Sequence, residues 1–143
     1  MCLMLYIATR DELPLDTSAD LRVEHVEPAR AAVGQWFSLP AVRFVGAHTG
    51  CSCGFPSVIA EVPIEYFDGM LDDHPDREAD LRSVDALLTL VRQHAATGVE
   101  LYPVGDGQEG SKPKGVIDVP VGSLRRETFF LNERFLHRVV PDP

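Results

Sequence analysis

The sequence predicts an α+β domain, with a mixed β-sheet of about five strands, one long amphipathic helix, one short helix and a C-terminal β-hairpin. Short apolar, β-rich runs gather toward the two ends of the chain, one strongly amphipathic segment lies between them, and the last apolar run contains a turn. Strands that do not alternate regularly with helices are typical of this class. A length of 143 residues is typical of a single domain, covering residues 1–143.

The strand predictions follow from apolar runs that are rich in β-branched and aromatic residues. The strongest of these runs lie at 2–8, 41–48 and 99–104. Two weaker runs lie at 21–26 and 58–64. The second is weakened by Pro63, because proline cannot donate a hydrogen bond to a neighbouring strand.

Two helices are predicted. The long helix covers about 74–97, since apolar residues recur there at steps of three and four, at Leu81, Val84, Leu87, Leu88, Val91 and Ala95. It is expected to begin near Asp73, with Pro75 in the first turn, and to end at Gly98. The short helix covers about 28–37 and is weakened by Gly34.

The C-terminal hairpin is predicted within 128–140, with Asn132 and Glu133 as its two-residue turn. In that register Phe130 faces Phe135 on one side of the hairpin, and Phe129 faces Leu136 on the other. Both sides would then be apolar, so the second side is either covered within the chain or exposed to a partner. Phe130 and Phe135 are therefore candidates for an interaction surface, which would bind another protein or form a homodimer.

Charge and composition exclude several classes of partner. The formal net charge is −9, which repels phosphate backbones and anionic lipids unless a basic patch is present. The sole adjacent basic pair is Arg125–Arg126, so neither nucleic-acid nor membrane binding is expected. No run approaches the roughly 20 apolar residues of a membrane span. Three cysteines, an odd number, favour a reducing compartment, and we expect a cytoplasmic protein.

Two patterns resemble functional motifs. GDGQEG at 105–110 matches G-x-G-x-x-G, but Pro113 and Gly115 follow where a nucleotide-binding motif requires a helix. We therefore interpret it as a flexible surface loop. The acidic run at 65–80, which includes His74, lacks the spacing of a calcium loop, and its carboxylates suit the first turn of the long helix.

The segment GAHTGCSCGFPS at 46–57 is the candidate site. Its glycines predict a tight loop that carries His48, Cys51 and Cys53. These residue types are ligands of zinc, and a structural zinc site needs four of them. Cys2 could be the fourth ligand if the N-terminal strand lies beside the strand at 41–48.

Two further interpretations of this segment stay open. A Cys-x-Cys pair can close a strained and easily reduced disulfide, and His48 could stabilise a reactive thiolate there. Alternatively, the cysteines are buried packing residues. Cys2 is expected to be buried because it begins a strand. The sequence therefore predicts a small cytosolic binding or interaction module, with a thiol- or metal-dependent enzyme as the alternative.

Overall fold

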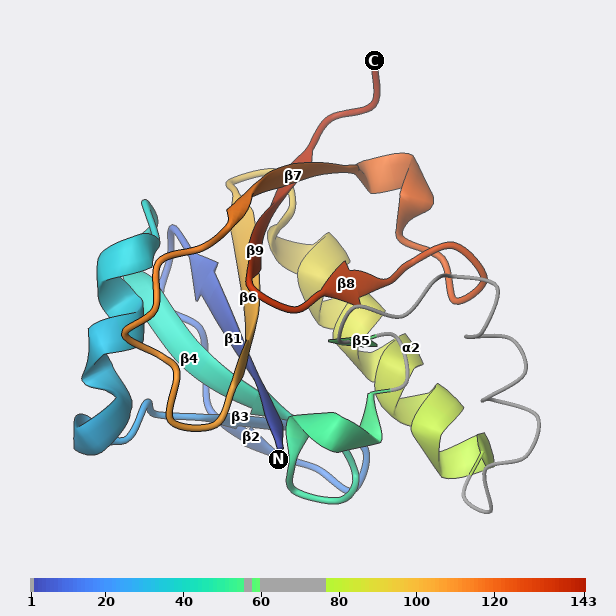
Figure 1. Cartoon of the computed structure of the whole chain (residues 1–143). Coiled ribbons are helices and arrows are strands. Elements are labelled where there is room, and N and C mark those ends of the chain that lie inside the picture. Colours follow the sequence, from blue (N-terminus) through green and yellow to red (C-terminus); the bar gives the residue numbers. More distant parts are fainter. Residues whose placement is uncertain (1, 56–57, 60–76) are drawn as a thin grey trace.

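A seven-stranded mixed β-sheet forms the centre of the computed structural model, which describes residues 2–55, 58–59 and 77–143 (Figure 1). The strands lie in the order β2-β3-β4-β1-β6-β9-β7, and β7 and β9 are parallel while the other neighbours are antiparallel. Their bounds are Leu3–Thr9 (β1), Asp16–Thr17 (β2), Arg22–Glu24 (β3), Ala41–Gly46 (β4), Val99–Gly105 (β6), Gly115–Pro120 (β7) and Phe135–Val140 (β9). The α+β class is confirmed, but the sheet has seven strands rather than about five.

The helices and the remaining short elements lie around this sheet. The bounds of the helical segments are Pro28–Trp36 (η1), Ser52–Gly54 (η2), Arg77–His94 (α2) and Val121–Ser123 (η3). A separate pair of two-residue parallel strands is formed by Val58–Ile59 (β5) and Leu131–Asn132 (β8). Within the described part of the chain, no helix has both the length and the hydropathy needed to cross a membrane.

Strand β1 is the centre of the sheet and is buried on both faces. Leu5 and Ile7 pack with the apolar side of α2, whereas Tyr6 packs with Val33 of η1 on the opposite face. Side chains alternate between the two faces of a strand, so a continuous apolar run is what a strand covered on both sides requires. Figure 1 shows η1 and α2 on opposite sides of the sheet.

Helix α2 confirms the long amphipathic helix. Its buried apolar residues are Val84, Leu87, Leu88 and Val91, all of which belong to the predicted face. The helix ends where Gly98 adopts a φ of +118° and its N–H donates to the carbonyl of His94 at 3.1 Å. Glycine is favoured at such a position because it has no Cβ. The predicted start near Asp73 lies outside the described residues.

The predicted short helix is present as the 3₁₀ segment η1, and two buried glutamates fix it to the sheet. The carboxylate of Glu100 accepts the N–H groups of Ser38 and Leu39 at 2.9 and 3.0 Å. The carboxylate of Glu109 pairs with the guanidinium of Arg30 in η1 at 3.1 Å, and its backbone carbonyl accepts the indole N–H of Trp36 at 3.0 Å. Buried charged groups must be hydrogen-bonded to be tolerated, and these bonds also hold η1 in place.

Strand β7 was missed by the sequence prediction. It is an edge strand whose side chains alternate outward and inward, and Val116 is 57% exposed. Its sequence therefore lacks the apolar run on which the other strand predictions rest. Its partner β9 is also distant along the chain and runs parallel to it, so no local turn marks the pairing.

The C-terminal chain reversal is present, but the predicted register is wrong. The turn residues are Glu133 and Arg134, one position later than expected, and Arg134 has a φ of +71°. Strand β8 pairs with β5, while β9 joins the main sheet, so Phe130 does not face Phe135 across a regular ladder. Both phenylalanines are half-buried.

Candidate functional site

Three cysteines from two distant parts of the chain meet at the start of β1. Cys2 immediately precedes β1, and Cys51 and Cys53 lie in the loop that follows β4. Because β1 and β4 are antiparallel neighbours, the beginning of β1 lies beside the end of β4. The three Sγ atoms all lie within 4.8 Å of one another. The cluster therefore arises directly from the pairing of two core strands.

Ser52, between the two loop cysteines, anchors this loop to the sheet. Its side chain is fully buried, and its hydroxyl donates to the carbonyl of Val45 at 2.7 Å. The same oxygen accepts the N–H of Leu5 at 2.8 Å. Since Val45 lies in β4 and Leu5 in β1, one hydroxyl bridges both strands and places a cysteine on either side of itself. This role of Ser52 was not predicted from the sequence, although a polar residue between two cysteines in a tight loop could have suggested it.

Gly54 allows the loop to pack closely against the chain before it. A Cβ atom at this position would lie 2.7 Å from the Cβ of Ala47 and 2.8 Å from the hydroxyl of Thr49. These distances are too short for any side chain to be accommodated without a shift. The loop is further closed by the N–H of Ala47, which donates to the carbonyl of Cys51 at 3.1 Å.

His48 does not join the cysteines. Its Nε2 lies 2.7 Å from Oδ1 of Asp80 in α2, and its backbone N–H donates to the hydroxyl of Ser83 at 3.0 Å. Asp80 is almost fully buried. The histidine thus connects the loop to the helix rather than to the sulfur atoms. Of the four residues expected to gather in this region, the structure brings together Cys2, Cys51 and Cys53.

The cysteines are not core packing residues. Cys2 and Cys53 are exposed and Cys51 is half-buried, so the expectation that Cys2 is buried was wrong. Cys2 is exposed because it precedes the first residue of β1. Although Cys53 is exposed as a residue, burial of its sulfur and, to a smaller extent, the neighbouring Cys51 raise the pKa of this thiol to about 11. At neutral pH this thiol is therefore protonated and a weak nucleophile.

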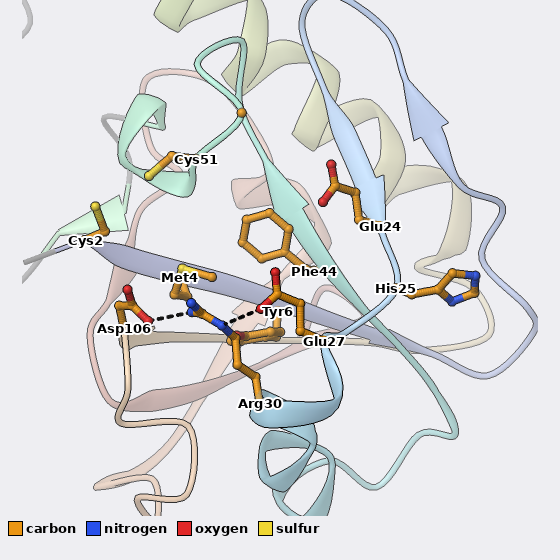
Figure 2. A pocket seen from close by; sticks show the side chains of 11 residues that line it. Cys2, Met4, Tyr6, Glu24, His25, Glu27, Arg30, Phe44, Cys51 and Asp106 are labelled. Atoms are coloured by element: carbon orange, nitrogen blue, oxygen red, sulfur yellow. Dashed lines mark hydrogen bonds and ion pairs between the residues drawn. The ribbon is translucent and has the colours of Figure 1, made fainter.

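A cleft of about 290 Å³ opens beside the cysteines on the η1 face of the sheet (Figure 2). Cys2, Met4 and Tyr6 line it together because alternate residues of a strand point to the same face. Phe44 of β4 forms another part of the apolar wall and contacts the ring of Tyr6 edge-on, with the ring centroids 6.0 Å apart. Cys51 lies at the same end of the cleft as Cys2.

Charged groups form the rest of the cleft. The guanidinium of Arg30 lies 2.6 Å from the carboxylate of Asp106, 3.1 Å from that of Glu109 and 3.3 Å from that of Glu27. The phenol of Tyr6 donates to the same oxygen of Glu109 at 3.1 Å. Burial, followed by the charge of Glu109, raises the pKa of Tyr6, so the phenol remains protonated.

The glycine-rich loop at 105–110 supplies two of these carboxylates. Asp106 and Glu109 both pair with Arg30, and Glu109 is only 4% exposed. The segment is a surface loop, as predicted, with Asp106, Gly107, Gln108 and Gly110 exposed, and the buried carboxylate of Glu109 anchors it. The absence of a following helix, on which the nucleotide motif was rejected, is confirmed, since β7 follows at Gly115.

No other histidine in the described part of the chain joins the thiol cluster. His25 is exposed at the rim of the cleft, His94 is in the last turn of α2, and His74 lies outside the described residues. His137 is buried in β9, where its Nε2 accepts the N–H of Asn132 at 3.1 Å. Phe130 and His137 line a second hollow of about 150 Å³ at the other end of the sheet.

Comparison of the chain with protein-family models, curated proteins and solved structures finds no match.

Proposed function

We propose that the protein is a small binding module whose ligand is a thiophilic metal ion, of which Zn²⁺ is the leading example, held by Cys2, Cys51 and Cys53. The observation that carries this proposal is the convergence of three sulfur atoms within 4.8 Å. Thiolates are the preferred protein ligands of zinc and of other soft ions.

The sulfur positions fit such an ion after a small contraction. A zinc ion bound at about 2.3 Å to each sulfur in tetrahedral geometry requires sulfur–sulfur distances of ~3.8 Å. Cys2 is exposed, so its side chain can rotate to make this adjustment. The anchored Ser52 meanwhile keeps the backbone of the loop in place.

Thiol redox catalysis is less well supported than metal binding. A nucleophilic cysteine needs a depressed pKa, whereas burial raises the pKa of Cys53. His48, the expected source of positive charge, is paired with Asp80. A bound dication would overcome the raised pKa of Cys53 and supply the positive charge that His48 does not, since it replaces the thiol protons and stabilises the thiolates.

Metal binding is expected to show one Zn²⁺ per chain in native mass spectrometry of protein purified without chelator or affinity metal. Cys53→Ser and Cys51→Ser should lose the ion, because each removes one of three ligands, whereas His48→Gln should retain it. Zinc at about 100 times its dissociation constant should add about 2.7 kcal/mol to the free energy of unfolding, and excess EDTA should remove this gain. A protein that binds no zinc, or loses it equally in His48→Gln, would contradict the proposal.

Self-association through the C-terminal segment is a second proposal, carried by the edge strand β7. Val116 is the neighbour of Leu136 in β9 and is 57% exposed, and Phe135 pairs with Gly115, the residue before Val116 in β7. An edge strand with exposed apolar side chains can pair with a second copy of the chain. We expect Val116→Asp to convert a dimer to a monomer with the fold intact, because Val116 is the exposed apolar residue of this edge strand. Light scattering that shows a monomer for the unmodified protein at micromolar concentration would refute the homodimer.

A further inference from the structure

We infer that the thiol centre has an open coordination position facing the cleft, and that the ligand taken there is a small organic thiol with a positive charge. This inference rests on the proposed metal site and extends it from the ion to the molecule that completes its coordination. Three features carry it: the number of sulfur ligands, their position relative to the cleft, and the charge of the cleft.

The number of ligands leaves one position to be filled. Within residues 2–55, 58–59 and 77–143, the cluster at the start of β1 contains three donors, all of them cysteines. His48, which could have been a fourth ligand, is held 2.7 Å from Asp80. Closed structural zinc sites have four protein ligands, while sites with three keep a position for water or for an exchanging ligand.

The position of the sulfurs directs that opening toward the cleft. Cys2 and Cys51 both line the cleft, whereas Cys53 is outside its lining and its sulfur lies 3.9 Å from the carbonyl of Leu3. Figure 2 shows the sulfur atoms of Cys2 and Cys51 at one end of the cleft, with Phe44 and Tyr6 farther along it. A ligand on the ion would therefore extend along these two aromatic rings.

The charge of the cleft favours a cation. Four carboxylates lie in the wall of the cleft or directly behind it, those of Glu24, Glu27, Asp106 and Glu109. They pair with only two guanidinium groups, those of Arg22 and Arg30. The excess of negative charge repels an anionic ligand and attracts a cationic one.

The preference of the metal ion determines the donor atom of the ligand in the fourth coordination position. A metal that prefers thiolates in its first three positions also takes a thiolate in the fourth. In this step the entering thiol loses its proton to the solvent, its sulfur forms a bond to the metal, and the water bound at that position leaves. No oxidant or reductant takes part.

The test uses the cobalt(II)-loaded full-length protein and two thiols of nearly equal size, thiocholine and 2-mercaptoethanesulfonate. Neither has a second group that chelates the metal well, and they carry opposite charges. Thiolate binding changes the visible absorption of cobalt(II), which gives a dissociation constant for each thiol. We expect thiocholine to bind about tenfold more tightly than 2-mercaptoethanesulfonate.

Charge variants separate the effect of the cleft from the different acidities of the two thiols. The affinity ratio should fall to less than about threefold in Glu24→Gln/Glu27→Gln, because the negative excess of the cleft is removed. It should be unchanged in Glu12→Gln/Glu127→Gln, which alters the net charge equally at exposed positions outside the cleft.

Each outcome has a distinct meaning. Cobalt(II) binding with no spectral response to either thiol would overturn the open position and leave the metal site intact. A thiol response with the same affinity ratio in all variants would overturn the role of the cleft's charge. Failure to bind cobalt(II) at all would refute the proposed function itself.

Discussion

Lowering the pH from about 7 to about 4 is expected to reduce the free energy of unfolding by about 3 kcal/mol through His137 alone. This side chain is only 1% exposed, and burial lowers its pKa to about 4, against an opposite and weaker effect of the carbonyls of Phe135 and Leu101. Its Nε2 accepts a hydrogen bond from the backbone of Asn132, and protonation of this nitrogen would abolish that bond.

The loss of stability at low pH follows from the different pKa of His137 in the folded and unfolded states. In the unfolded chain the histidine titrates near its ordinary pKa of about 6.5, whereas in the folded protein it stays neutral down to about pH 4. Between these values the unfolded state binds the additional proton, so stability falls as the pH is lowered. Below the folded pKa both states are protonated and this contribution no longer changes.

The measurement is urea unfolding across this pH range in excess EDTA, which removes the pH dependence of metal binding. His137→Gln cannot titrate and should lose the corresponding part of the pH slope, while the exposed His25→Gln should keep it. If His137→Gln does not fold, an NMR titration of the histidine rings in the unmodified protein gives the pKa directly. A ring of His137 that titrates near pH 6.5 would refute this prediction.

Ser52→Ala is expected to lower the free energy of unfolding by about 2–4 kcal/mol, because two buried backbone groups lose their partner together. The N–H of Leu5 and the carbonyl of Val45 both bond to the Ser52 hydroxyl, which is fully buried. Since the same bonds place Cys51 and Cys53, zinc affinity should fall as well. Chemical unfolding with EDTA measures the first effect, and zinc titration measures the second.

Ser18→Ala is the matched control for this serine. Its hydroxyl also bonds to a backbone carbonyl, that of Leu21 at 3.1 Å, but the residue is exposed, so water can replace the bond. We expect a change below about 0.5 kcal/mol. Equal stability of both variants would show that the buried bridge does not hold the loop.

The elements that the sequence predicts well are those whose residues carry the pattern themselves. The apolar face of α2 and Gly98, which closes the turn after the helix, are both visible in the chain, and the buried strand β1 is a continuous apolar run. Strand β7 has no such run, and the turn at Glu133–Arg134 lacks the glycine that usually marks a hairpin turn. The position of β7 and of this turn is set by contacts with other parts of the chain, and not by a pattern in their own residues.

The site was only partly predictable for the same reason. The short spacing of Cys51 and Cys53 is visible in the sequence, and the neighbouring position of two predicted core strands suggested Cys2. The direction of His48 could not be predicted, because it is set by Asp80 in a helix that begins at Arg77. The anchoring of η1 by Glu109 likewise depends on a contact between segments far apart in the chain.

The central place of β1 has a consequence for biosynthesis. Its two neighbours are β4 and β6, and β6 is completed only at Gly105. During synthesis, one edge of β1 therefore has no partner strand until β6 has been translated. At bacterial or eukaryotic translation speeds this period lasts roughly 5 to 20 s. Pairings between such distant segments also form slowly because of the entropy of closing the loop between them. The nascent chain therefore exposes an apolar strand edge for seconds, and a translational pause before Val99 would prolong this exposure.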